Sequence, residues 1–157
     1  DKSLSKTYVA TYSTSGSDLM QLAYDVRDVS NFEVSAQPEV DNVGENMFDQ
    51  DLGTRWTAYD LEATATLELT QQCDISAVAL GFWKGNSRVY EFDISVSTDG
   101  VNYTTVGSYH SSGEEEDYEI FRFPTVQAKY VRYTGHGNNE NSNSNILEFR
   151  VLNAKEQ

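Results

Sequence analysis

Three oxygen-bearing side chains, Asp49, Asp51 and Thr54, lie close together in one short stretch of the sequence. Carboxylate, carbonyl and hydroxyl oxygens on a tight loop are the ligands that Ca²⁺ prefers. An EF-hand loop has similar spacing but does not fit, because its obligatory glycine position is Thr54 and its last position is Asp60 rather than Glu. We therefore expect either a calcium loop of another kind or an aspartate-rich turn.

No set of residues indicates a catalytic centre. The 157-residue chain contains two histidines and one cysteine, and no Ser-His-Asp arrangement, phosphate-binding loop or histidine-rich metal cluster is recognisable. Two of the 25 acidic residues could form a glycosidase pair, but no motif singles out such a pair. The sequence therefore predicts a protein that is not an enzyme.

The formal net charge of −14 limits the partners that the chain can bind. Nucleic acids and anionic membranes are bound through Lys and Arg, so we expect neither as a partner. No apolar run approaches the length of about 18 residues that a membrane span needs. A monomer is expected.

Alternating apolar and polar residues indicate β-strands along most of the chain. Residues 75–82 are apolar on both faces, as in a strand that is covered on each side. Asp99-Gly100 between two alternating runs indicates a hairpin. The expected strands are 61–69, 75–82, 90–97, 101–106, 118–123, 129–134 and 146–152. Short strands with frequent turns and little helix predict an all-β fold, an antiparallel sandwich or barrel.

Residues 1–28 differ from the rest of the chain. Residues 13–17 resemble a flexible linker, although 7–12 could form one added strand. We interpret 1–28 as a linker or N-terminal extension that could pack on the domain, and 29–157 as the compact domain of a larger protein. The first residues lack the apolar segment of a signal peptide, so we expect that any such peptide has been removed or excluded.

Three stretches form a pattern in a fixed order: 46–56, ending in Thr54-Arg55-Trp56; 92–104, with Asp99-Gly100; and 129–133 together with 146–151. This pattern resembles the signature of the F5/8 type C (discoidin) domains and of family-32 carbohydrate-binding modules. The resemblance implies an antiparallel jelly-roll β-sandwich of the galactose-binding-like kind.

The loops 84–88 and 135–138 look like those of modules attached to bacterial polysaccharide lyases, alginate lyases above all. Two positions depart from the family. Gln50 stands where the family prefers glycine, which is tolerable if the backbone geometry there is normal. Residues 143–145 replace a Trp-Asn-Ser sequence, so a stacking aromatic ring is missing from one edge of the site.

The resemblance implies a structural calcium ion beside the sugar site. Its ligands would be the carbonyls of Asn46 and Asp51, the carboxylate of Asp49, the hydroxyl and carbonyl of Thr54, the carbonyl of Leu147 and the side chain of Glu148. Glu148 lies between two apolar residues of an expected strand, so its charge needs a partner. The alternative is that Glu148 points to solvent beside an aspartate-rich turn.

The resemblance also implies that loops at one end of the sandwich bind sugar through a flat ring and a few polar groups. The candidate residues are Tyr59, Trp83, Lys84, Arg88, His136, Asn138 and Asn141. Arg88 could clamp a uronate carboxylate through paired N–H groups, and Lys84 could add charge. Trp83 could equally belong to the core, and His136 and the tract 138–145 could serve only to stabilise a loop. We expect Trp56 in the core.

The function implied is that of a secreted, bacterial, non-catalytic module that directs an attached polysaccharide-degrading enzyme to its glycan. An alginate-type uronate is the first candidate for the glycan and a galactose-type sugar the second. The alternative is an adhesion domain that binds protein or lipid. Lipid-binding relatives expose apolar residues ringed by basic ones, which the acidic composition here does not favour.

Overall fold

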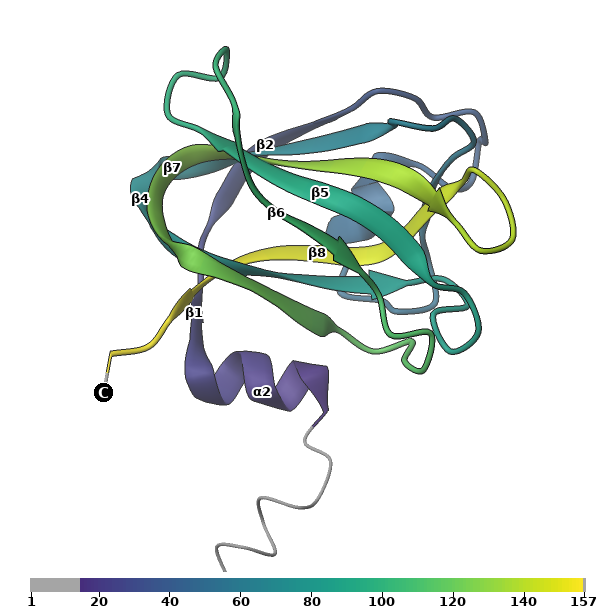
Figure 1. Ribbon diagram of the computed structural model, residues 1–157, viewed down its shortest axis with the longest axis horizontal. Helices are drawn as coiled ribbons and strands as arrows, with labels where there is room; N and C mark the ends of the chain where they lie inside the picture. Colours follow the sequence, from purple (N-terminus) through teal and green to yellow (C-terminus); the bar gives the residue numbers. More distant parts are fainter. Residues whose placement is uncertain (1–14, 157) are drawn as a thin grey trace, which may run out of the picture.

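Two long strands, β4 (Thr64–Phe82) and β7 (Glu119–Asn138), organise the chain. The computed structural model describes residues 15–156, and in it β4 and β7 pair with each other on both sides of a bend. The register of this pairing shifts between Glu68 and Cys73, where both strands turn from one layer to the other (Figure 1). Each long strand therefore belongs to both layers.

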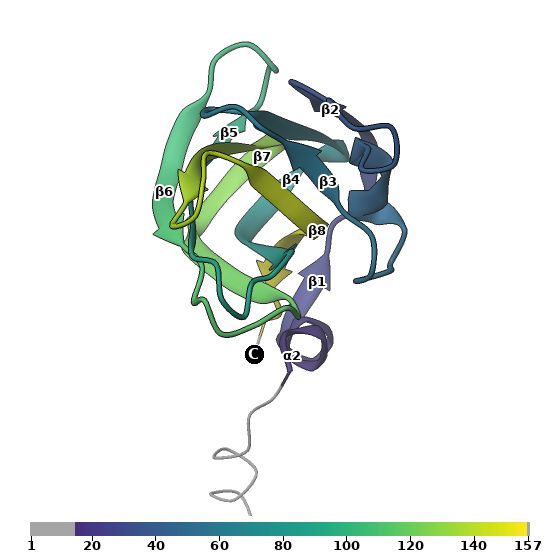
Figure 2. The same ribbon diagram turned by 90° about the vertical axis from the view of Figure 1, so that its right-hand side faces the viewer.

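The other strands complete two antiparallel layers (Figures 1 and 2). One layer holds the first half of β4 and the second half of β7 with β2 (Val29–Val34), β5 (Tyr90–Ser97) and β6 (Thr104–His110). The other holds the remaining halves with β8 (Ser144–Ala154), which pairs also with β1 (Tyr24–Val26) and β3 (Trp56–Ala58). The predicted all-β antiparallel sandwich is confirmed.

Strand β4 joins two strands that the sequence predicted separately. Its first half alternates as expected, and the inward side chains of Ala65, Leu67 and Leu69 are buried. Leu61 was expected on the same face, but this is wrong, since its side chain is 60% exposed. The reason is local: Leu61 lies in the turn before the strand, where Glu62 has a left-handed φ of 60°.

The predicted hairpin around Asp99-Gly100 is present, with a longer turn than expected. Val96 pairs with Thr104, so residues 101–103 belong to the turn and not to the returning strand. The Asp99 Oδ1 atom accepts hydrogen bonds from the backbone N–H groups of Val101 and Asn102, both at 2.8 Å. These bonds stabilise the turn in place of strand pairing.

Large aromatic side chains fill the space between the layers. Phe82 stacks on Tyr90 with ring centroids 4.6 Å apart, and Phe92 stacks on Tyr133 at 5.2 Å. Trp56 has no exposed surface, and its Nε1 donates to the Ala36 carbonyl at 2.9 Å. The expectation that Trp56 belongs to the core is therefore confirmed.

A short N-terminal helix, α2 (Gly16–Ala23), and strand β1 lie against the outside of the sandwich (Figure 1). Met20 and Tyr24 pack on Ala77, Ala79 and Leu152. Residues 75–82 are therefore apolar on both faces because the core covers one face and this segment covers part of the other. The sequence pattern did not indicate this helix. The added strand predicted over 7–12 lies outside the described residues.

Within residues 15–156, no helix combines the length and apolar character that crossing a membrane requires.

Candidate functional site

The turn that follows the 3₁₀ helix η1 (Gly44–Phe48) brings three of the predicted calcium ligands together. Thr54 Oγ1 lies 2.5 Å from Asp49 Oδ2 and 3.2 Å from the Asp51 carbonyl oxygen. The Asp51 N–H donates to the other Asp49 oxygen at 2.9 Å. The carboxylate, carbonyl and hydroxyl oxygens of this turn therefore face one another.

Glu148 reaches the same turn from strand β8. Its side chain has no exposed surface, so the alternative that it points to solvent is wrong. Its Oε1 accepts from the Gln50 N–H and from the Tyr118 hydroxyl, both at 3.2 Å, and from Arg150 Nη2. Burial raises the pKa of Glu148 to about 7, and the neighbouring Asp49 carboxylate raises it further in the same direction. Arg150 acts to lower this pKa but does not cancel the two effects.

The Oε2 atom of Glu148 is buried and has no hydrogen-bond partner among the described residues. An unpaired carboxylate oxygen beside a second carboxylate is an environment that a hard cation satisfies, so the donor set fits calcium. Within residues 15–156 no group of three or more His, Cys, Asp or Glu side chains could hold a metal. An ion here would therefore depend on carbonyl and hydroxyl oxygens as well.

The remaining predicted ligands frame this turn. The Asn46 side-chain amide donates to the carbonyls of Asp41 at 2.9 Å and Arg55 at 2.8 Å. Leu147 precedes Glu148 on β8 and is 2% exposed. Gln50 has a left-handed φ of 62°, so the normal backbone geometry under which a non-glycine residue would be tolerable here is not met. Glycine adopts this conformation without steric cost, which explains the family's preference for it.

A cluster of cations surrounds Trp83, which directly follows β4 at the end of the sandwich where β7 also ends. The Arg55 Cζ lies 3.9 Å from the ring centroid, the Lys84 Nζ 4.7 Å and the Arg88 Cζ 4.9 Å. We call Arg55, Lys84 and Arg88 the cationic cluster. The aromatic ring attracts all three charges and so offsets part of their mutual repulsion. Trp83 is half-buried, so it supports the cations as well as the fold.

Both arginines rest on a buried polar floor. Thr57 and Asn145 are partners in the pairing of β3 with β8, and each is 1% exposed. The Asn145 amide nitrogen donates to Thr57 Oγ1 at 3.0 Å, and Thr57 Oγ1 also accepts from Arg55 Nε at 3.2 Å. Asn145 Oδ1 accepts from Arg88 Nη1 at 3.3 Å. This floor therefore sets the separation and direction of two guanidinium groups.

Tyr90 also contacts this polar floor through Asn145. Its hydroxyl donates to the Trp83 carbonyl at 2.7 Å and lies 3.1 Å from Asn145 Oδ1. Burial raises the pKa of Tyr90 to about 12, although Arg88 and Arg55 act to lower it. The phenol is thus neutral at physiological pH and serves as a hydrogen-bond donor.

The other predicted sugar-binding residues lie at the same end but outside the cluster. Tyr59 is 46% exposed, its hydroxyl bonds to Glu39, and its carbonyl accepts from the Ser142 hydroxyl at 3.0 Å. The Asn138 amide nitrogen donates to Asn141 Oδ1 at 2.9 Å, and Asn138 Oδ1 accepts from the Asn141 N–H at 3.1 Å. The two asparagines stabilise the loop that follows β7, which was the alternative role considered for this tract.

His136 faces away from the cationic cluster, on the outer side of β7. Its Nε2 lies 3.0 Å from Asp93 Oδ2, and the Ser108 hydroxyl donates to Asp93 Oδ1 at 2.7 Å. The Ser108 bond and the contact with His136 hold the pKa of Asp93 below its ordinary value, against burial. The carboxylate stands between the serine and the histidine, so this trio lacks the Ser–His contact of a nucleophilic triad.

Sequence analysis did not identify Arg55, Thr57 and Asn145 as site residues. A usable signal was present for Arg55 and Thr57, because strand alternation places both on the face opposite the buried Trp56. The third residue, Asn145, requires knowledge that β3 pairs with β8.

Comparison with known proteins identifies the domain. The family model of the F5/8 type C domain matches residues 29–149. The chain belongs to this family. The solved "CBM32 of AlyQ in complex with 4,5-unsaturated mannuronic acid" is 31% identical to this F5/8 type C domain, with a TM-score of 0.77, and the match covers 81% of this chain and 97% of that one. The domain is therefore also a member of the family-32 carbohydrate-binding modules (CBM32).

Two further structures are similar to this F5/8 type C domain. "Truncated AlyQ with CBM32 and alginate lyase domains" is 31% identical, with a TM-score of 0.81, and the match covers 85% of this chain but 34% of that one. A pectin-binding carbohydrate-binding module is 28% identical, with a TM-score of 0.75, over 80% of this chain and 91% of the other. No curated protein matches the sequence. The chain thus spans about a third of the two-domain AlyQ protein.

Proposed function

We propose that this domain is a non-catalytic carbohydrate-binding module whose cationic cluster binds the carboxylate of a uronate-containing glycan. The supporting observation is that three cations converge on Trp83 in a protein whose formal net charge is −14. Cations that were needed only for solubility would not gather at one ring. The AlyQ module in complex with 4,5-unsaturated mannuronic acid is a neighbour of the same family.

The chemistry of the cluster favours an anion over a neutral sugar. Arg55 and Arg88 each retain guanidinium N–H groups beyond those bound to Thr57 and Asn145, so each can donate to a carboxylate. A carboxylate placed between the two would relieve the repulsion between them. A neutral hydroxyl would accept hydrogen bonds without that electrostatic gain.

A structural calcium ion is the second part of the proposal. Asp49, Asp51, Thr54 and Glu148 would hold it, with the carbonyls of Asn46 and Leu147. The ion would supply positive charge to the buried Glu148 oxygen and would link the first loop to the last strand. Arg55 directly follows this turn in the sequence, so the ion would also stabilise one wall of the cationic cluster.

The third part concerns the attached enzyme. We infer that the module acts outside the cell and raises the effective concentration of a linked polysaccharide-degrading domain at its polymer. The AlyQ protein, which carries CBM32 and alginate lyase domains, is the precedent for such an arrangement.

Titration calorimetry with a short mannuronate oligomer tests the binding site. Arg88→Ala should weaken binding about tenfold or more, because a charge-assisted hydrogen bond contributes about 1.5–3 kcal/mol. The matched control is Lys155→Ala, which removes the same charge directly after the end of β8 and should bind as the wild type does. The oligomer should remain uncleaved. Equal affinity of Arg88→Ala and wild type would contradict the proposed site.

A further inference from the structure

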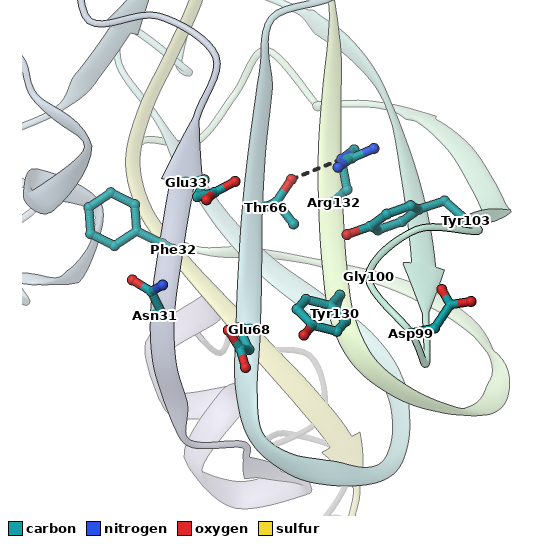
Figure 3. A pocket seen from close by; sticks show the side chains of 10 residues that line it. All are labelled: Asn31, Phe32, Glu33, Thr66, Glu68, Asp99, Gly100, Tyr103, Tyr130 and Arg132. Atoms are coloured by element: carbon teal, nitrogen blue, oxygen red, sulfur yellow. Dashed lines mark hydrogen bonds between the residues drawn. The ribbon is translucent and has the colours of Figure 1, made fainter.

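A hollow opens on the outer face of the β2-β4-β7 layer, beside the turn between β5 and β6 (Figure 3). It encloses about 290 Å³ and shares no residue with the cationic cluster. Its lining includes Asn31, Glu33, Tyr103, Tyr130 and Arg132. The loop between β4 and β5 lies at the other end of the sandwich from the β5–β6 turn (Figure 1).

The floor of the hollow consists of two adjacent rows that cross three strands. Glu33 pairs with Thr66, and Thr66 pairs with Arg132. In the next row Asn31 pairs with Glu68, and Glu68 pairs with Tyr130. Residues two apart on a strand share a face, so all of these side chains point out of the same side of the layer (Figure 3). Extended strands hold them at fixed spacing.

The wall of the hollow is the rigid turn after β5. Gly100 has a φ of 76°, and a Cβ atom there would lie 3.0 Å from Tyr130 Cε1, so the bare backbone rests on the tyrosine ring. Tyr103, at the far side of the turn, covers Arg132, with the guanidinium Cζ 3.8 Å from the ring centroid. Both aromatic rings are therefore held in place without a ligand.

Several polar groups in the hollow have free hydrogen-bonding capacity. Arg132 Nε donates to Thr66 Oγ1 at 2.9 Å, which leaves its terminal nitrogens to other acceptors. This is the only hydrogen bond drawn among the ten lining residues in Figure 3. The side chains of Asn31, Glu33, Tyr103 and Tyr130 make no hydrogen bond to any of these neighbours. Rings together with convergent polar groups are the composition of a sugar site.

The charge of the hollow differs from that of the cationic cluster. Glu33, Glu68 and Asp99 line it with Arg132 as the one cation, and Glu68 is offset by Lys129 at 3.5 Å. The net charge of the other charged lining residues is negative, so a uronate carboxylate would be repelled. A hydroxyl can instead donate to Glu33 and accept from Arg132 or Asn31.

We propose that this hollow is a second saccharide site, which takes an uncharged pyranose unit of a neutral glycan. The apolar face of the sugar would lie against Tyr103 and Tyr130, and its hydroxyls would bond to Asn31, Glu33 and Arg132. The domain then contacts two kinds of polysaccharide at once, an acidic one at the cationic cluster and a neutral one on the face of the layer.

An amide chemical-shift titration of the full chain tests this site. The probes are neutral gluco-, manno- and galacto-oligosaccharides, with a mannuronate oligomer for comparison. At least one neutral oligomer should shift the amide signals of Tyr103, Tyr130 and Arg132 and leave that of Trp83 unchanged. The mannuronate oligomer should not shift the signals of the hollow. No shift in the hollow with any neutral oligomer, or shifts there with mannuronate instead, would overturn the proposal.

Three variants test whether the hollow itself binds. Glu33→Gln keeps the shape of an exposed side chain and should weaken neutral-sugar binding about tenfold, since hydrogen bonds to charged groups are the stronger ones. Glu91→Gln removes an equal charge from an exposed position on β5 outside the hollow and should have no effect. Arg88→Ala should leave neutral-sugar binding intact, which separates this proposal from the one for the cationic cluster. Equal weakening by Glu33→Gln and Glu91→Gln would refute the site.

Discussion

Glu148 is a carboxylate with no solvent exposure on the last strand of the domain. A buried charge is costly unless it is paired and fully hydrogen-bonded. Arg150, Gln50 and Tyr118 satisfy one oxygen of Glu148, while the other has no partner among the described residues. The residue is therefore the most sensitive test of whether a cation belongs in the first loop.

Glu148→Gln should abolish the response of the domain to calcium. With calcium in excess the wild type should gain stability, by about 2.7 kcal/mol at a hundred times the dissociation constant, and EDTA should remove that gain. The amide variant lacks the charge that holds the ion, so its melting temperature should be the same in calcium and in EDTA. Thermal unfolding followed by circular dichroism, together with metal analysis, measures both effects.

Glu119→Gln is the matched control for this experiment. Glu119 also has a buried carboxylate oxygen without a hydrogen-bond partner among residues 15–156, and burial raises its pKa, but it lies on β7 and its other oxygen accepts from the Ser112 N–H and not from the Asp49 turn. Its variant should keep the calcium response. The calcium proposal would be contradicted if EDTA did not change the wild-type melting temperature and metal analysis found no metal. Arg150 would then be the partner of Glu148.

Helix α2 and strand β1 cover part of the outer face of the sandwich. Met20 is 9% and Tyr24 6% exposed, and they cover the small outward residues Ala77 and Ala79 of β4. Tyr24 also accepts a hydrogen bond from Arg122 Nε at 2.7 Å. The helix begins with a capped turn, since Ser15 Oγ accepts from the Asp18 N–H at 3.1 Å.

A chain that begins at Val29 should be less stable than one that begins at Ser15. Burial of a large apolar side chain contributes about 1.5–3 kcal/mol, and the loss of two such side chains is partly offset by the chain entropy regained. We expect a decrease of about 2–4 kcal/mol in the free energy of unfolding, measured by urea denaturation. Met20→Ser in the longer chain should reproduce part of the decrease, and Leu22→Ser, at a position 73% exposed, should not. Equal stability of the two chains would show that α2 and β1 are dispensable.

Taken as a whole, the domain buries several phenols among its aromatic side chains. Burial raises the pKa values of Tyr90 and Tyr118 to about 12 and raises that of Tyr133 as well. In the unfolded chain these phenols would ionise near their ordinary pKa of 10. The folded state therefore keeps protons that the unfolded state loses, and the stability of the domain falls as pH rises from about 10 to about 12.

Alkaline titration should separate the tyrosines into two groups. The buried tyrosines should ionise only as the chain unfolds, whereas phenols outside the core should ionise while it is still folded. Phenolate absorbance and circular dichroism, recorded on the same samples, compare the two events. Tyr90→Phe should reduce the loss of stability above pH 10, the ordinary pKa of the group that it removes. Ionisation of all ten phenols before unfolding would contradict the burial described here.

Both proposed binding sites arise from the path of the two long strands. At the ends of β4 and β7 the loops bring together Arg55, Lys84 and Arg88, and near the bend of the same strands the outer face carries the hollow. A single rigid framework thus presents a cationic site and an acidic one at different places. Their separation allows each to be removed by substitution without loss of the other.

The sequence by itself determined the all-β fold, the buried Trp56, the hairpin at Asp99-Gly100 and the family. These features depend on local patterns, because strand alternation and turn residues act over a few positions. The same pattern identified Asp49, Asp51 and Thr54 as one turn. The family resemblance, and not this pattern, led to Lys84 and Arg88, two of the three residues of the cationic cluster.

Only the tertiary structure decided which side chains meet. Arg55 joins Arg88 because β3 pairs with β8, so that Thr57 lies beside Asn145, 88 positions away in the chain. His136 turns to Asp93 because outward residues of β7 face β5 and not the loops. Alternation along a strand tells which face a residue takes, but the neighbour on that face depends on the pairing of distant strands. That pairing results from packing of the complete core and cannot be read from any one segment.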